Sequence, residues 1–249
     1  MTGYGNWGYP VTRKELRRTG FRGPVQEMED WKMKYIFLAA FWLLTIWHLV
    51  DSWRNDQRRR AMSKPFLLLT LALFYVFSAE KISLVLVGAL LTSWLGDVLL
   101  IPKGHGWFIT GGVFFLISHF LFIAVYIPYI QFAQVPWLLI VPVALVYYGI
   151  SFAVIRAVKP TTPKLMVAPM CLYLLINSAM NVFALMRLIT TRSLGGIVGY
   201  IGAVLFFVSD CVLYLVRYHK NENLVFKKHF SVMLAYLTGE FLIALGVLL

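Results

Sequence analysis

The sequence predicts an all-α membrane protein, a bundle of about eight transmembrane helices. Hydrophobic residues make up 60% of the 249-residue chain, and the mean hydropathy is +0.74, which is more apolar surface than a soluble core of this size needs. The apolar residues form successive stretches near the roughly 17–25 residues that a helix needs to cross a bilayer. Because no stretch alternates in the manner of barrel strands, the bundle is predicted to be helical.

Eight stretches are candidate membrane helices. The second, which begins beside Lys64, is the shortest. The third and seventh contain an Asp, the fourth a His, the sixth an Asn and the eighth a Glu. The loops between them leave no room for a folded soluble domain, so residues 33–249 are predicted to form a single membrane domain. In chain order the stretches cover residues 33–50, 65–79, 82–102, 107–128, 136–157, 165–189, 194–216 and 229–249.

Residues 1–32 form a polar, basic tail without the apolar segment of a signal peptide. The run TRKELRR at residues 12–18 follows several glycines, and we expect the tail to be loosely ordered or to lie on lipid headgroups. The first apolar stretch would then be an uncleaved anchor. A net charge of +12 is ordinary for a membrane protein and favours a membrane surface over a nucleic acid as the partner.

Two Asp residues lie at similar places in the third and seventh stretches. Residues 88–100 read GALLTSWLGDVLL and residues 202–214 read GAVLFFVSDCVLY, which align after a one-residue shift and suggest a 4+4 parallel repeat. Stretches four crossings apart run in the same direction. Asp97 and Asp210 lie six and seven residues before the next basic residue, so both carboxyls would sit roughly 9–11 Å below one membrane face. Placing a charge in a bilayer costs at least about 2.5–3.5 kcal/mol, so charged residues within spans usually have a function. A cavity shared by the two acids is therefore a candidate active site.

Four further polar residues could support the two acids. His119, Asn177 and Glu240 lie nearer the middle of their stretches and would form the floor of the cavity. Lys64 begins the second stretch on the aspartate face, where its ammonium could reach a phosphate or an Asp. Structural interpretations remain open: an Asp, His119 or Glu240 could bond a neighbouring helix, and Lys64 could be a snorkelling anchor.

The basic residues predict the orientation in the membrane. The loops on the aspartate face and their flanks carry 13 Lys and Arg residues, against Lys81, Arg187 and Arg192 on the opposite side. By the positive-inside rule the aspartate face is cytoplasmic. The six basic residues of the N-terminal tail, with Lys34 just after it, lie on the other face and argue against this orientation.

Five pieces of the sequence, in a fixed order, carry a resemblance to a known family. They are KPFLLLTLAL (64–73), LLTSWLGDVLLI (90–101), GGVFFLISHFLFIAVY (111–126), GAVLFFVSDCVLYLVRY (202–218) and AYLTGEFLIALG (235–246). Together they resemble the YhhN-like family of membrane lysoplasmalogenases over the second to the eighth stretch. Tyr126 and Tyr214 lie in these pieces and join the supporting residues. Glu240 stands where Gln or another polar residue is expected, and the tail before Trp31 has no counterpart.

The resemblance implies hydrolysis of the vinyl ether bond of a lysoplasmalogen, a lysophospholipid in the bilayer, to a fatty aldehyde and glycerophospho-ethanolamine or -choline. A vinyl ether is cleaved when its β-carbon is protonated and water captures the oxocarbenium ion, which parallels glycoside hydrolysis by two carboxyls. Two nearby carboxyls in a low-dielectric cavity resist ionising together, so one would stay protonated near neutral pH. The pair would be Asp97 and Asp210, and the residues do not say which is the acid.

Two other functions fit part of the pattern. A proton-coupled transporter of a small molecule or lipid would also use intramembrane acids, but usually with helices broken at midplane, whereas Pro142 and Pro169 lie near the ends of their stretches. A zinc hydrolase needs about three ligands together, and apart from His229 at the very start of the last stretch only His48 and His119 lie within spans, so no metal or other cofactor is expected. No nucleic-acid partner is expected, and the oligomeric state is left open.

Overall fold

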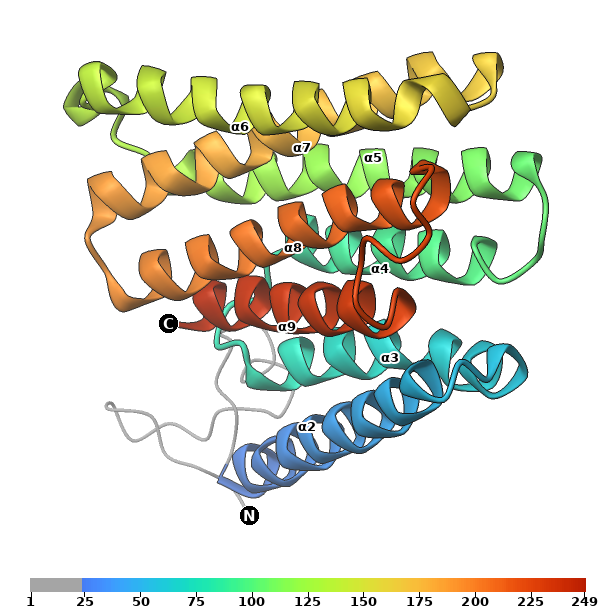
Figure 1. Ribbon diagram of the computed structural model, residues 1–249. Coiled ribbons are helices and arrows are strands. Elements are labelled where there is room, and N and C mark those ends of the chain that lie inside the picture. The colour runs from blue at the N-terminus through green and yellow to red at the C-terminus, as the bar shows by residue number, and fades with distance from the viewer. Residues whose placement is uncertain (1–23) are drawn as a thin grey trace, which may run out of the picture.

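The computed structural model describes residues 24–249, and in this part of the chain it is all-helical (Figure 1). Seven of the long helices are apolar enough to cross a membrane, and α4 is a shorter apolar helix. The predicted fold class is confirmed. The 3-10 helices η1 (Ile127–Tyr129), η2 (Phe132–Gln134) and η3 (Lys159–Thr161) lie in loops. The long helices are α2 (Pro24–Trp53), α3 (Gln57–Ser78), α4 (Leu84–Leu99), α5 (His105–Tyr126), α6 (Trp137–Val158), α7 (Lys164–Thr191), α8 (Leu194–Tyr218) and α9 (His229–Leu248).

Two predicted helix boundaries were wrong. Helix α3 has 22 residues and is not the shortest, because it begins two turns before the apolar stretch that was predicted at 65–79. The Asp56 side chain caps this polar start by accepting a hydrogen bond from the Arg59 backbone N–H at 3.1 Å. The shortest of the long helices is α4, with 16 residues. Helix α2 begins at Pro24, inside the predicted 1–32 tail, and residues 1–23 lie outside the described part.

Helix α8 lies at the centre of the bundle and contacts α6, α7 and α9 (Figure 1). Its closest approach is to α9, where glycines let the two backbones touch. A Cβ added to Gly246 would lie 2.5 Å from the Gly199 nitrogen, and one added to Gly202 would lie 2.7 Å from the Gly239 carbonyl oxygen. Small residues at such crossings are typical of helix pairs in membranes. The close pairing fixes the position of α9 relative to the carboxyl that α8 carries.

A similar close pair joins α4 to α5. A Cβ added to Gly96 would lie 3.1 Å from the Gly111 carbonyl oxygen and would overlap the Phe115 ring. Helix α5 in turn packs on α7. The two helices that carry the predicted acids are therefore each held against a partner helix that carries further polar side chains. The 4+4 duplication itself stays a prediction.

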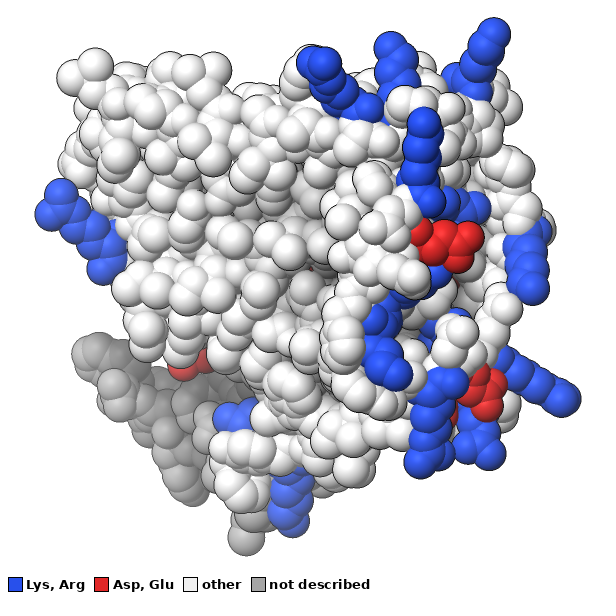
Figure 2. Space-filling view, in the orientation of Figure 1, with Lys and Arg blue, Asp and Glu red and all other residues white. Residues whose placement is uncertain are grey.

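Helices α4 and α8 run in the same direction and end at the same end of the bundle (Figure 1). Asp97 lies two residues before the last residue of α4, and Asp210 lies within the second half of α8. Figure 2 shows Lys and Arg side chains gathered at this end, over the loops that follow α2, α4, α6 and α8. The long apolar helices are consistent with a multi-pass integral membrane protein, and the cytoplasmic placement of the basic end stays a prediction.

Candidate active site

Asp97 and Asp210 lie in the wall of one cavity of about 150 Å³. Both side chains are buried, with 2% and 5% of their surface exposed. The cavity lies between six helices, α3, α4, α5, α7, α8 and α9, and the loop after α4, so residues far apart in the chain meet there. Its other lining residues are Lys64, Leu100, Phe108, Phe115, Tyr173, Ser209, Leu213, Arg217, His229, Val232, Met233 and Tyr236.

The Asp97 carboxylate pairs with a cation and a phenol. Its Oδ1 lies 3.1 Å from Lys64 Nζ, and its Oδ2 accepts a hydrogen bond of 2.8 Å from the Tyr236 hydroxyl. Lys64 is held in place because the next residue on α3, Pro65, accepts a 2.6 Å hydrogen bond at its carbonyl from the Trp94 indole of α4. Thus three helices, α3, α4 and α9, fix this carboxylate.

The Asp210 carboxyl has different partners. Its Oδ2 accepts hydrogen bonds from the Tyr173 hydroxyl at 2.7 Å and from the Asn177 side-chain amide at 2.8 Å, both on α7. His119 Nε2, on α5, lies 3.4 Å from the same oxygen. The neighbouring Ser209 hydroxyl donates to the Val232 carbonyl at 3.0 Å and ties this turn of α8 to α9. Every described contact of Asp210 involves Oδ2, which leaves Oδ1 available to a ligand in the cavity.

The two ring nitrogens of His119 each face an oxygen. Its Nδ1 lies 2.5 Å from the Phe115 carbonyl oxygen, and because a carbonyl can only accept, Nδ1 carries a hydrogen. In a neutral imidazole Nε2 would then be a bare lone pair facing the Asp210 oxygen, and two acceptors repel. His119 is fully buried, and Nε2 has no hydrogen-bond partner among the described residues. One proton between Nε2 and the Asp210 carboxyl removes the repulsion, whichever atom carries it.

The remaining predicted supporting residues lie outside this group of contacts. Glu240 is fully buried one turn along α9 from Tyr236 and faces the Ser93 hydroxyl, but neither of its oxygens forms a hydrogen bond with a described residue. The Tyr126 hydroxyl also has no described partner, and its ring lies 5.9 Å from the Arg187 guanidinium. Neither residue lines the acid cavity, so of the predicted floor only His119 and Asn177 reach Asp210.

Sequence analysis missed two site residues, Tyr173 and Tyr236, which donate to the two acids. A signal for both was present in helical spacing. Tyr173 lies four residues before Asn177 and Tyr236 four before Glu240, so each tyrosine shares a helix face with a residue that was singled out. A tyrosine in a span is ordinarily a packing residue, which is why neither stood out.

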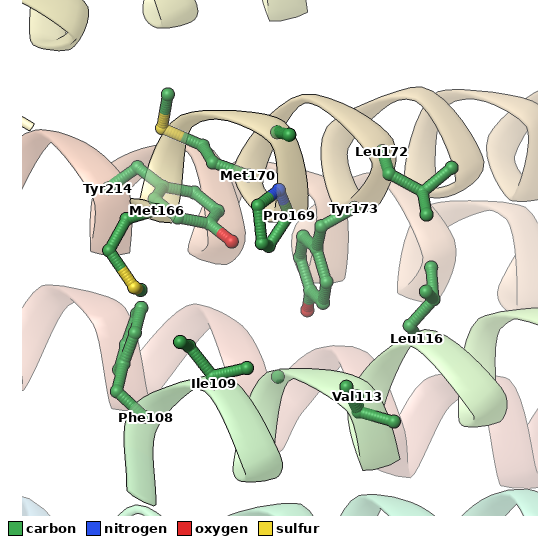
Figure 3. A pocket seen from close by; sticks show the side chains of 12 residues that line it. Phe108, Ile109, Val113, Leu116, Met166, Pro169, Met170, Leu172, Tyr173 and Tyr214 are labelled. Atoms are coloured by element: carbon green, nitrogen blue, oxygen red, sulfur yellow. The ribbon is translucent and has the colours of Figure 1, made fainter. Parts of the chain in front are cut away.

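An apolar cavity of about 500 Å³ adjoins the acid cavity (Figure 3). It lies between α5 and α7, and Figure 3 shows the Tyr173 ring projecting from α7 into it. Phe108 and Tyr173 line both cavities, and Tyr214 of α8 lines the apolar one. The Tyr173 hydroxyl donates a hydrogen bond to Asp210. An apolar chain in this cavity would therefore contact the same tyrosine that contacts the acid.

Within residues 24–249 no three His, Cys, Asp or Glu side chains are grouped so that they could hold a metal ion. The arrangement around Asp97 and Asp210 is instead one of two carboxyls with separate hydrogen-bond donors. Such a pair can donate a proton from one side and accept one on the other.

Comparison with known proteins adds a family to this geometry. The model of the YhhN family matches residues 59–247, from the first turn of α3 to the last turn of α9, and includes every residue of the acid cavity. No curated protein and no solved structure matches the chain. The family match covers well over half of the sequence and spans all five of the sequence pieces described above. The chain belongs to the YhhN family, which is associated with lysoplasmalogenase activity.

Proposed function

We propose that this protein hydrolyses the vinyl ether bond of a lysoplasmalogen, releasing a fatty aldehyde and glycerophospho-ethanolamine or -choline. The observation that carries the proposal is the pair of buried carboxyls in one cavity, each with its own set of partners. Two carboxyls with different surroundings can divide the roles of proton donor and water-orienting base. Membership of the YhhN family supports the reaction class.

The contacts favour one assignment of the two roles. An ion pair with Lys64 requires the carboxylate form of Asp97, so Asp97 is the base that orients water. Among the described residues no Lys or Arg pairs with Asp210, whose partners are Tyr173, Asn177 and His119, so we assign the role of the acid to Asp210. His119 is a positioning residue in this scheme, because it contacts the acid and holds its carboxyl in place without touching the substrate.

The reaction then proceeds in three proton-balanced steps. Asp210 gives its proton to the β-carbon of the vinyl ether, and the double-bond electrons shift to form an oxocarbenium ion. Asp97 takes a proton from water as the water oxygen bonds the α-carbon, which gives a hemiacetal. Proton transfer from Asp97 to the ether oxygen then releases the alcohol of the glycerol backbone, and loss of the hemiacetal hydroxyl proton to Asp210 yields the aldehyde and restores the acid. The net change is the addition of one water.

The apolar cavity gives the alkenyl chain a place beside the acids. It lies between membrane helices α5 and α7, and its volume of about 500 Å³ falls in the usual range for small-molecule sites. Its wall is built from apolar and aromatic side chains such as Ile109, Val113 and Met170. A chain lying there would bring its first carbons to Tyr173, at the boundary with the acid cavity.

Purified protein in detergent tests the proposal. It should release aldehyde from an alkenyl lysophospholipid and none from the saturated alkyl analogue, because a saturated ether has no carbon that Asp210 can protonate. Fatty acid release from an acyl lysophospholipid at a comparable rate would show that the reaction class is wrong. Failure to release aldehyde, together with proton-driven lipid uptake in vesicles, would instead indicate a transporter.

A further inference from the structure

A polar cavity of about 310 Å³ lies at the basic end of the bundle, next to the acid cavity. Its wall comes from α2, α3 and α9, the loop between α2 and α3, and the segment that follows α4. Lys64 and His229 line both this cavity and the acid cavity, so the two are continuous at those side chains. The polar side chains in its wall are His48, Asn55, Gln57, Arg60, Lys64 and His229.

The cavity is lined by cations without a carboxylate in the wall. Arg60 and Lys64 lie four residues apart and therefore on one face of α3. The Arg60 Nε is buried and has no hydrogen-bond partner among the described residues. Asp51 and Asp56 lie close enough to Arg60 to attract it, but neither lines the cavity. Arg60 therefore lines a polar cavity with part of its hydrogen-bonding capacity unused, although a charged donor of this kind normally finds an acceptor.

We propose that this cavity binds the phosphodiester of the lysophospholipid substrate, which rests on the proposed function. Arg60 would donate hydrogen bonds to the phosphate oxygens, and Lys64 would lie between the phosphate and Asp97. Arginine's planar fork suits a phosphate, and the half-buried site strengthens the pairing. The order of the three cavities then fixes the direction of the substrate: phosphate at Arg60, vinyl ether between Asp97 and Asp210, and alkenyl chain along α5 and α7.

The same wall indicates what the cavity does not select. The ethanolamine or choline nitrogen carries a positive charge, and the wall offers it neutral groups, such as the amide oxygens of Asn55 and Gln57, but no carboxylate. With no carboxylate to pair with that nitrogen, ethanolamine and choline forms should bind with similar affinity. The phosphate is thus the recognised group.

Binding of a substrate analogue that cannot be hydrolysed tests the inference without turnover. The probe is a saturated alkyl lysophosphocholine, and the reference ligand is the matching alkyl glycerol, which lacks the phosphate; the Kd of each is measured by tryptophan fluorescence with purified protein in detergent. Arg60→Gln should weaken binding of the phospholipid at least tenfold, since a hydrogen bond to a charged group is lost, and should weaken the alkyl glycerol much less. Arg58→Gln is the matched control, because it removes the same charge from an exposed position of the same turn outside the cavity wall.

Three results would overturn the inference. Equal effects of Arg60→Gln and Arg58→Gln on phospholipid binding would show that only the overall basic charge matters. Equal losses for phospholipid and alkyl glycerol would place Arg60 in a structural role. Inorganic phosphate binding as tightly as the phospholipid, and in an Arg60-dependent way, would identify a site for free phosphate instead of a lipid headgroup. If Arg60→Gln does not fold, Arg60→Lys keeps the charge without the planar guanidinium and should still weaken phospholipid binding severalfold. Unchanged binding would show that the guanidinium of Arg60 does not bind the phosphate.

Failure of the proposed function is recognised separately. Wild-type protein that binds the alkyl lysophospholipid through Arg60 but releases no aldehyde from any vinyl ether would contradict the hydrolase. If the wild-type protein releases aldehyde but Arg60→Gln binds the phospholipid as tightly as wild type, the phosphate site is contradicted and the hydrolase is not.

Discussion

The ion pair between Lys64 and Asp97 allows stability and catalysis to be separated in one pair of variants. In Asp97→Asn the amide oxygen can keep the hydrogen bond from Tyr236, but the NH₂ group then faces the Lys64 ammonium, which the carboxylate had held at 3.1 Å. Removing one partner of a buried pair costs about 3–5 kcal/mol, and because 15% of the Lys64 side chain is exposed we expect about 3 kcal/mol. Turnover should fall by about 10²–10⁴ because the base is lost.

A second substitution removes the stranded charge. In the double variant Lys64→Met with Asp97→Asn, the cavity holds no unpaired ammonium, so thermal unfolding in detergent should return close to the wild-type midpoint. Aldehyde release should stay at the low level of Asp97→Asn, since water still lacks its base. Recovery of wild-type turnover in the double variant would refute the reasoning, because it would mean that Asp97 serves only to neutralise Lys64.

Four other predictions follow from the contacts. Asp210→Asn should keep the hydrogen bond from Tyr173 but lower aldehyde release by about 10²–10⁴, and a rate near that of wild type would exclude Asp210 as the acid. His119→Gln should lower kcat less than Asp210→Asn and leave KM unchanged, because His119 touches the acid and not the substrate; an altered KM would contradict that placement. Aldehyde release should survive EDTA, and a loss that zinc restores would indicate a metal enzyme. Gly246→Ala should destabilise the protein by about 1–3 kcal/mol in thermal unfolding, since its Cβ would meet the Gly199 backbone, whereas Gly112→Ala, which meets nothing within 4 Å, should not; equal midpoints would contradict the described helix contact.

The helices could be predicted from sequence more fully than their ends. A long apolar stretch marks a segment that must avoid water, and in a membrane such a segment forms a helix. Each of the eight predicted stretches corresponds to a helix of the structure. The start of α3 escaped because its first turns, QRRRAMSK, are polar and are held by the Asp56 cap instead of by burial. Hydropathy cannot register a helical turn whose stabilisation comes from a local hydrogen bond.

The site was predictable in its acids but not in its partners. Asp97 and Asp210 stood out because carboxyls are costly in a membrane, and counting crossings placed them at one end. Which donor meets which carboxyl depends on helix rotation and on the close glycine contacts, neither of which a single sequence reports. Lys64 could have met a phosphate or an Asp, and only packing of α3 against α4, through the Trp94 hydrogen bond, brings it to Asp97.

The shortness of α4 has a consequence for the surrounding membrane. Sixteen residues make a helix about 24 Å long at ~1.5 Å per residue, whereas the hydrocarbon layer is about 30 Å thick. A helix shorter than the layer thins the lipid beside it or draws headgroups inward. Asp97 lies near the end of this helix, and the ether linkage of a lysophospholipid lies just beneath its headgroup. Under the proposed function, a lysophospholipid would therefore reach the acids at the depth where it already resides, and the thickness of the host membrane would help determine how readily it does so.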